Sequence, residues 1–405
     1  MKKFIMYGAG NIGRGFIGQL FSNSGYSVGF VDINKEVIGR LNADKEYPVD
    51  VVSGDVIDEQ IVKNVYGIDG TDIELVSNEI ASADIMATAI GVNVLKFIAK
   101  PIALGLKKRF EANAKPFNII ICENLIGADA FLKGLIKDQI PEYADRIDKE
   151  IGFVEASIGR MVPVVPEEKK QGNPLRVYVE PYNILPVDKD AFKGEIPEVT
   201  NLYPFAPFNL FIQRKLFMHN MSHAVSAYLG YLRDYTYIYE SIADFDIRLV
   251  AYKALTQSAL AVSKENGVEI DILLSHAENL IYRFTNKALG DTVERVGKDT
   301  MRKLSSNDRL IGAINLAEKH DLPCTYLCIG VAAGMLFNPD ADERSKELYA
   351  YAMENGAKAT LKKYSDYEGK NLDLICELYD MLKKGKQISA LIKYADEYTG
   401  KEIRV

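Results

Sequence analysis

The fold is decided by Lys3-Phe-Ile-Met-Tyr-Gly8-Ala-Gly10-Asn-Ile-Gly13. An apolar strand pattern runs into the spacing Gly-x-Gly-x-x-Gly, and a helix pattern follows to about Ser24. A second strand pattern then ends at Asp32. A glycine-rich turn between a strand and a helix is the dinucleotide-binding fingerprint in its expected context. The sequence therefore predicts a βαβ unit that binds a dinucleotide.

Each part of this fingerprint has a separate task. Gly8 permits the tight turn, Gly10 lets the backbone approach a pyrophosphate, and Gly13 lets the helix pack closely on the strand. The N-terminus of the helix, at Asn11 and Ile12, offers N–H groups and a positive dipole end to the phosphates. We predict that these five residues bind the cofactor.

Asp32 stands 19 residues after Gly13, at the predicted end of the second strand. A carboxylate there can accept hydrogen bonds from both ribose hydroxyls and would repel a 2′-phosphate, which favours NAD over NADP. An aspartate that only starts the turn before Asn34 is the alternative. Arg14, in the glycine loop, could itself meet a phosphate.

Two further loops are predicted at the carboxyl ends of core strands. Residues 83–91 read as a strand that ends in small residues, and residues 117–122 form the next strand. Such loops lie against the cofactor, so Thr88 and Gly91 are predicted to contact it. Asn124 follows the second of these strands and is a candidate site residue. An asparagine that only closes a turn is the alternative.

The domain organisation follows from a change of pattern along the chain. The 405 residues allow two domains and a large core. Residues 150–165 read as rich in strand, residues 166–174 as an exposed excursion, and the patterns from about 210 onward as almost all helical. We predict an α/β protein with a Rossmann-type dinucleotide-binding domain with insertions over residues 1–205. A mostly α-helical substrate and catalytic domain follows over residues 206–405.

Composition narrows the classes of function. The net charge of −7 argues against a general nucleic-acid binder. Four cysteines make no disulfide framework in a chain this long, which favours the cytoplasm. The longest apolar run, residues 326–337, is too short for a membrane span, and a strand pattern at the N-terminus predicts no signal peptide. We expect a cytoplasmic monomer or small homo-oligomer that binds a small molecule.

The candidate chemistry lies on Lys215-Leu-Phe-Met-His-Asn220-Met-Ser-His223, which starts a predicted helix. At about 100° per residue, Lys215, His223 and Asn220 fall near ~0°, ~80° and ~140°, within one face. A lysine on a half-buried helix can lose charge by desolvation and then accept a proton. The alternative is a solvated lysine beside ordinary polar residues. His219 and His223 have the spacing of a zinc helix, but Asn220 replaces the glutamate of His-Glu-x-x-His, so we predict no metal.

Lys215-x4-Asn220-x2-His223 is similar to the signature of the polyol-specific long-chain dehydrogenases. The resemblance extends over most of the chain in four further blocks: Gly8–Gly18, Cys122–Asn124, Asp291–Gly297 and Arg302–Ile311.

The resemblance implies metal-free hydride transfer with NAD, between D-mannitol 1-phosphate and D-fructose 6-phosphate. Lys215 would take the hydroxyl proton on oxidation and return it on reduction. Asn220 and Asn124 would donate hydrogen bonds to the reacting oxygen, and His223 would orient the substrate and the lysine.

A substrate phosphate in an acidic protein needs fixed positive charge. Arg302 and Lys303 match the family's Arg-Lys-Leu block, and an arginine fork suits a phosphate, so we predict these two as its ligands. A solvated charged face is the alternative for either residue. Two other functions stay open: a free-polyol or hexuronate reductase of the same family, and a non-catalytic NAD-binding sensor. The Lys/Asn/His set argues against the sensor.

Overall fold

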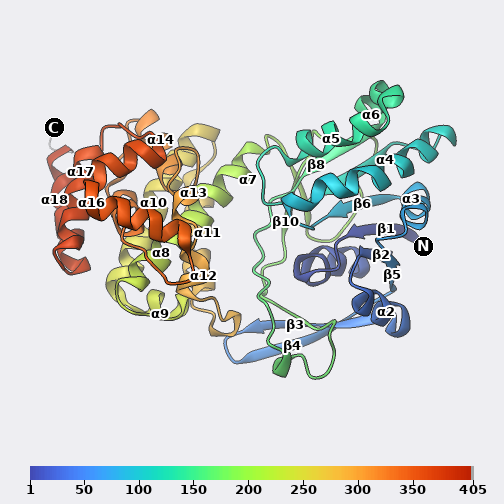
Figure 1. Ribbon diagram of the computed structural model, residues 1–405, viewed down its shortest axis with the longest axis horizontal. Coiled ribbons are helices and arrows are strands. Elements are labelled where there is room, and N and C mark those ends of the chain that lie inside the picture. The colour runs from blue at the N-terminus through green and yellow to red at the C-terminus, as the bar shows by residue number, and fades with distance from the viewer. Residues whose placement is uncertain (403–405) are drawn as a thin grey trace. The chain divides into compact units, whose positions relative to one another are not determined.

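The computed structural model describes the backbone of residues 1–402 and the side chains of residues 1–398 (Figure 1). The chain divides into two compact units, Met1–Phe208 and Asn209–Val405. The first unit is built on a parallel sheet and the second consists of helices. The predicted fold class, a Rossmann-type domain followed by a mostly helical domain, is confirmed.

The first unit is organised around a six-stranded sheet with the order β5-β2-β1-β6-β7-β8, in which every pair is parallel. Its strands are β1 (Lys2–Tyr7), β2 (Tyr26–Asp32), β5 (Val65–Asp69), β6 (Ile85–Thr88), β7 (Phe117–Ile121) and β8 (Ile151–Glu155). The strand order reverses direction between β1 and β6. The loops after these two strands therefore lie at the topological switch point, where open parallel sheets bind their ligands.

Helices cover both faces of this sheet, as its apolar strands require. On one face, η1 (Gly13–Gly18) and α1 (Gln19–Asn23) pack around Phe4 and Phe30. On the other, α3 (Ile73–Ala81), α4 (Leu95–Glu111) and α5 (Ala128–Gln139) pack around Ile5. The remaining helices of the unit are α2 (Lys35–Asp44), η2 (Val92–Val94), η3 (Pro141–Tyr143), α6 (Ala144–Glu150) and η4 (Glu167–Lys169).

Two small sheets complete the first unit. β3 (Glu46–Ser53) pairs with β4 (Val56–Lys63) and β9 (Val177–Val179), and β10 (Leu185–Asp188) pairs with β11 (Leu202–Phe205). The prediction that residues 150–165 are rich in strand is wrong beyond β8, because residues 157–166 are irregular. Pro163 and Pro166 lack the N–H that a strand ladder needs. The excursion at 166–174 holds η4 and a turn.

The second unit is an assembly of helices packed around two apolar ones, α8 and α15. Its elements are α7 (Asn209–Gln213), η5 (Arg214–Asn220), α8 (Met221–Tyr231), α9 (Ile238–Ala243), α10 (Phe245–Asn266), α11 (Ile270–Phe284), η6 (Lys287–Leu289), α12 (Val293–Gly297), α13 (Thr300–Lys303), α14 (Ile311–Lys319), α15 (Thr325–Gly334), α16 (Glu343–Ser365), α17 (Leu372–Lys383) and α18 (Ile388–Glu402). All ten residues of α15 are buried, as the apolar run predicted.

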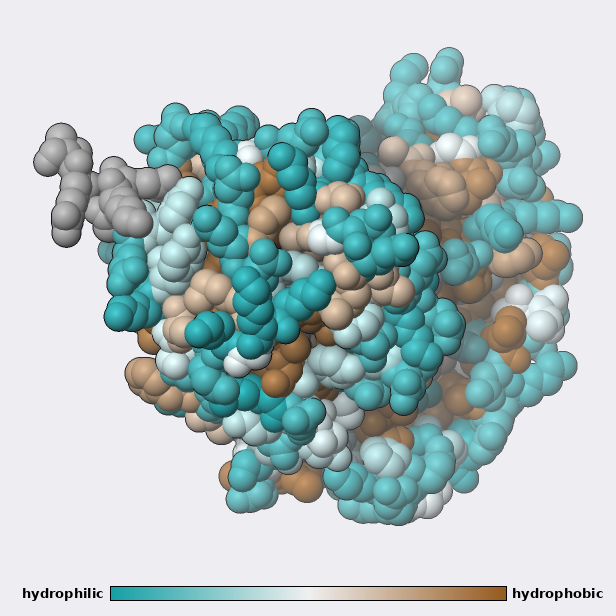
Figure 2. Space-filling view, turned by 60° about the vertical axis from the view of Figure 1, so that its left-hand side comes forward, coloured by the Kyte–Doolittle hydropathy of each residue, from teal (hydrophilic) through white to brown (hydrophobic). Residues whose placement is uncertain are grey.

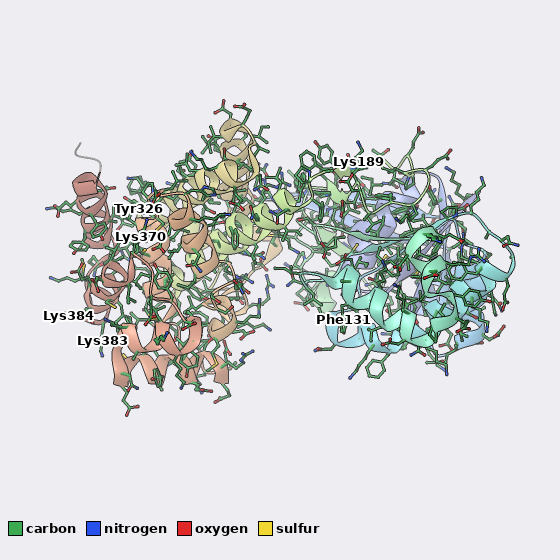
Figure 3. The ribbon with its side chains drawn as sticks, turned by 90° about the horizontal axis from the view of Figure 1, so that it is seen from above. Phe131, Lys189, Tyr326, Lys370, Lys383 and Lys384 are labelled. Carbon is green, nitrogen blue, oxygen red and sulfur yellow. The ribbon has the colours of Figure 1, made fainter. Side chains whose placement is uncertain are left out.

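Polar contacts at the rim of this unit hold its last helix. The Tyr326 hydroxyl, on α15 (labelled in Figure 3), donates to the Asp396 carboxylate on α18 at 2.6 Å. Lys253, on α10, donates to the same carboxylate at 2.9 Å. The face of the helical unit turned to the viewer in Figure 2 is mainly hydrophilic, with apolar side chains in small separate patches. Among the described residues, no helix is long and apolar enough to cross a membrane.

Candidate active site

The loop after β1 forms a close-packed turn with one open side. Gly8 has a φ of +107°, and a Cβ there would lie 2.5 Å from the Ala89 carbonyl oxygen. A Cβ on Gly13 would lie 2.0 Å from the Gly8 carbonyl oxygen. By contrast, no described atom lies within 4 Å of a Cβ on Gly10. The backbone at Gly10 is therefore open to an approaching pyrophosphate, while its neighbours need glycine for packing.

The helix that follows starts at Asn11 and Ile12 and winds as the π-helical segment η1 from Gly13. Buried Arg14 turns back into the protein, because its Nη1 donates to the Ala9 carbonyl oxygen at 2.7 Å. Burial lowers the pKa of Arg14. The Arg14 side chain thus binds the backbone of the glycine turn. It is not directed at a phosphate, as the sequence had left open.

Asp32 faces the glycine loop from the end of β2. Its Oδ2 accepts the Ala9 N–H at 2.8 Å, and its Oδ1 accepts the Asn34 N–H at 2.9 Å. The carboxylate therefore fixes the loop and starts the turn after β2. Two N–H contacts leave lone pairs on both oxygens, so a ribose contact stays a prediction.

The loop after β6 packs directly on the glycine loop. Tyr7 pairs with Thr88 across β1 and β6, and the Ala89 N–H donates to the Tyr7 carbonyl at 2.9 Å. Thr88 is fully buried, and its hydroxyl has no hydrogen-bond partner among the described residues. Gly91 has a φ of +89°, a conformation that glycine adopts readily. A buried hydroxyl without a partner beside the glycine turn fits a site that a polar ligand completes.

Two carboxylates that sequence reasoning missed hold the neighbouring loops. Glu123 is 7% exposed and accepts the N–H groups of Ile90 and Gly91 at 3.0 and 2.8 Å. Glu155, at the end of β8, accepts the Gly127 N–H at 3.0 Å. Burial and the nearby Asp129 raise the pKa of Glu155 to about 7. The sequence feature that could have identified both residues is an acidic residue at or just after the end of a buried strand.

Asn124 lies in the loop after β7, between Glu123 and Gly127 in the sequence, and it is exposed. The unit that holds it also holds every predicted cofactor residue. The open backbone at Gly10, the Thr88 hydroxyl and the Asp32 carboxylate all lie at the carboxyl ends of β1, β6 and β2. This combination of an open backbone, a hydroxyl and a carboxylate fits a dinucleotide at the switch point.

In the helical unit, Lys215 lies on a π-helical segment rather than on a regular α-helix. The predicted angular positions are therefore wrong, because π-helical hydrogen bonds join residue i to residue i+5. Because this winding has more residues per turn than an α-helix, Lys215 and Asn220 are expected closer to the same side of the helix than the predicted separation of about 140°. Both residues are partly buried. Single π-helical turns inside α-helices are frequent at functional sites.

His223 lies beside an acid and an aromatic ring. Its Nε2 lies 3.4 Å from Asp291 Oδ2, and its ring stacks on Phe284 with a centroid distance of 4.7 Å. Burial lowers the pKa of His223, the Asp291 carboxylate opposes this shift, and Arg295 and Lys303 add to it. The neutral imidazole can both donate and accept a hydrogen bond.

A buried arginine beside this helix, Arg283, was not predicted. Burial, followed by the charge of Arg283, holds the pKa of His219 well below its usual range. Lys215 and His276 contribute to the same lowering. Arg283 is 6% exposed on α11. An arginine at the end of an amphipathic helix, directly before Phe284, gave no clear signal in the sequence.

The predicted phosphate ligands have different surroundings. Arg302 Nε lies 3.0 Å from Asp299 Oδ2, and its Nη1 lies 3.1 Å from Asp308 Oδ2. Lys303 is 4% exposed, and its ammonium donates to the Val296 carbonyl oxygen. Burial, followed by the charges of Arg309 and Arg302, lowers the pKa of Lys303 to about 7. Both roles stay predictions.

Comparison with known proteins identifies the family. The mannitol dehydrogenase Rossmann domain matches residues 2–201, and the mannitol dehydrogenase C-terminal domain matches residues 208–395. The chain belongs to the mannitol dehydrogenase family. This confirms the resemblance seen in the sequence, and with it the expectations of an NAD-dependent oxidoreductase and of NAD as cofactor.

Two relatives match this family member over almost its whole length, and both are mannitol-1-phosphate 5-dehydrogenases. One, from Caldanaerobacter subterraneus subsp. tengcongensis, is 35% identical over 379 residues, which cover 93% of this chain and 97% of the relative. The other, from Thermoanaerobacter pseudethanolicus, is 36% identical over 394 residues, which cover 96% and 98%.

Solved structures share the fold at low identity. A D-sorbitol dehydrogenase in substrate-free form superposes with a TM-score of 0.82 and 17% identity, covering 96% of this chain and 94% of that one. A mannitol 2-dehydrogenase from Pseudomonas fluorescens, in ternary complex with NAD and D-mannitol, gives a TM-score of 0.75 and 16% identity, covering 98% and 94%. In the described part of the chain, no group of three or more His, Cys, Asp or Glu residues is arranged to hold a metal ion.

Proposed function

We propose that this mannitol dehydrogenase family member interconverts D-mannitol 1-phosphate and D-fructose 6-phosphate with NAD. The observation that carries the proposal is the set of basic side chains near His219 and His223 on the Lys215 segment, which stand together with the Asp291 carboxylate. Lys215 and Arg283 act on His219, and Arg295 and Lys303 act on His223. The chain as a whole has a net charge of −7, so this local charge suits an anionic substrate.

Lys215 is proposed as the acid/base of the reaction. No carboxylate lies between Lys215 and Tyr228 in the sequence to neutralise it within its own helix. His219 stays neutral near pH 7 because its pKa is held low, so it neither takes the reaction's proton nor adds a further charge. In the oxidative direction Lys215 accepts the hydroxyl proton, and in the reductive direction it returns it.

The other candidate residues would act on the reacting oxygen. Asn220, one π-helical turn from Lys215, and Asn124, from the first unit, are proposed to donate amide hydrogen bonds to it. His223, which lies beside Asp291 and stacks on Phe284, is proposed to orient the substrate. NAD, when bound, supplies the hydride acceptor. The identity of 35–36% to two mannitol-1-phosphate 5-dehydrogenases supports the choice of substrate.

The proposal is tested by following NADH oxidation with fructose 6-phosphate, fructose and fructuronate. Fructose 6-phosphate should give the highest kcat/KM. A preference for fructose or fructuronate would replace the proposal with a free-polyol or hexuronate reductase. NADH binding without turnover of any of the three would favour a sensor. We also propose a cytoplasmic monomer or small homo-oligomer, to be tested by localisation of the tagged protein and by its mass in solution.

A further inference from the structure

The carboxylate of Glu123 joins two loops at the switch point of the sheet. Glu123 follows β7, and its side chain reaches back to the loop after β6. One oxygen accepts the Ile90 N–H at 3.0 Å and the other accepts the Gly91 N–H at 2.8 Å. Hydrogen bonds to an ionised acceptor are stronger than neutral ones. Because the side chain is 7% exposed, water competes weakly for these two donors.

The loop that Glu123 holds forms one wall of the glycine turn. A Cβ on Gly8 would lie 2.5 Å from the Ala89 carbonyl oxygen and 2.9 Å from Ile90 Cγ2. Gly91 has a φ of +89°, and glycine alone imposes little preference on its own conformation. The Ala89 N–H is held by the Tyr7 carbonyl at 2.9 Å, and the two contacts to Glu123 fix the rest of the loop, Ile90 and Gly91.

We propose that Glu123 is a positioning residue that fixes the Ala89–Gly91 loop for cofactor binding. Since Glu123 directly precedes Asn124, it also ties the cofactor loop to the loop of a candidate substrate-binding residue. This second part rests on the proposed function of Asn124. The first part rests only on NAD binding and can be measured without any sugar.

Glu123→Gln is the central variant. Glutamine has the same shape, but its amide accepts only one of the two N–H groups and turns its own NH₂ towards the other. The dissociation constant of NADH, from the fluorescence change of NADH itself, should rise about ten- to a hundredfold. Glu123→Asp keeps the charge on a shorter side chain and should lie between Glu123→Gln and wild type.

Glu155→Gln is the matched control, since Glu155 also stands at the end of a buried strand but accepts the N–H of Gly127, after β7, rather than the Ile90 and Gly91 N–H groups that Glu123 accepts. Its NADH affinity should stay within about twofold of wild type. KM for the sugar at saturating NADH should change less than NADH affinity in Glu123→Gln, a split that general destabilisation would not produce. Unchanged NADH affinity in folded Glu123→Gln, or equal losses in both Gln variants, would overturn the proposal.

Gly91→Ala perturbs the same loop while Glu123 is intact. A Cβ on Gly91 meets no described atom within 4 Å, so the variant is strained only by its positive φ. NADH affinity should fall here as well. If Glu123→Gln does not fold, Glu123→Asp and Gly91→Ala decide the matter, and wild-type NADH affinity in both would refute the positioning role.

Discussion

Replacement of Lys303 by methionine tests the buried positive charge beside His223. The Lys303 ammonium is 4% exposed and donates to the Val296 carbonyl. Burial, with Arg309 and Arg302 nearby, lowers its pKa from 10.5 to about 7. Methionine has a similar length and no charge, so the variant removes the titrating group and leaves most of the packing.

The magnitude follows from the two pKa values. Between pH 7 and 10.5 the unfolded chain keeps a proton that the folded protein has released, so wild-type stability rises with pH in this window. The slope is about 1.4 kcal/mol per pH unit, or about 2 kcal/mol between pH 7 and 9. Below pH 7 both states carry the proton and this dependence disappears. Lys303→Met lacks the term, so its unfolding free energy relative to wild type should fall by about 2 kcal/mol from pH 7 to 9.

Urea unfolding of both proteins at several pH values measures this difference. Methionine also leaves the Val296 carbonyl without its donor, which costs about 1–3 kcal/mol at every pH, so the slope and not the offset is decisive. Lys298→Met, at an exposed lysine five residues earlier, is the control and should show no comparable slope. Parallel pH profiles of wild type and Lys303→Met would refute the buried charge.

Three further predictions concern the reaction. Lys215→Ala should lower kcat by about 10²- to 10⁴-fold and leave NADH affinity nearly unchanged; near wild-type turnover at neutral pH would remove Lys215 from the mechanism. Asp32→Gly should weaken NAD and narrow its advantage over NADP, measured as two dissociation constants, and a wild-type enzyme that prefers NADP would contradict the assignment. Arg302→Ala should lower kcat/KM for fructose 6-phosphate about ten- to a hundredfold and barely change that for fructose; equal losses would give Arg302 a structural role.

The parts of the fold that the sequence predicted are those fixed by local rules. A Cβ on Gly8 or Gly13 would lie 2.5 or 2.0 Å from a backbone carbonyl oxygen, so the turn requires glycine at both positions and can be recognised from the sequence. The apolar run of α15 also predicted its structure correctly, because a helix whose ten residues are all buried needs apolar side chains on every face. Periodicity and glycine spacing record such constraints within a few neighbouring residues.

The candidate site was predicted less completely because much of it depends on contacts distant in sequence. Glu123 reaches Gly91, 32 residues away, and no local pattern encodes that pairing. The π-helical winding at Lys215 changes which residues align on this helix, and the roles of the residues themselves stay predictions. His223 and Asp291 come together only when α8 and the segment before α12 pack.

The two predicted phosphate ligands, Arg302 and Lys303, differ in how available their charges are to a phosphate. Arg302 is 46% exposed and already lies between the carboxylates of Asp299 and Asp308. A phosphate would have to compete with both. The Lys303 ammonium is buried against a carbonyl oxygen, which offers only partial compensation for its charge. A dianion beside Lys303 would favour its charged form and raise its pKa, so substrate binding would take up a proton above pH 7.

This difference can be read from the pH dependence of substrate binding. If Lys303 contacts the phosphate, KM for fructose 6-phosphate should rise between pH 7 and 9 in the wild type, because the free enzyme loses the Lys303 proton over this range. Lys303→Met should have a high KM with little of this rise, and Arg302→Ala should keep the rise. KM for fructose should show no rise of this origin in any of the three proteins. A rise that persists in Lys303→Met would show that a group other than Lys303 titrates. Arginine keeps its charge over this range, so a pH-independent increase in KM for fructose 6-phosphate in Arg302→Ala alone would assign the phosphate to Arg302 instead.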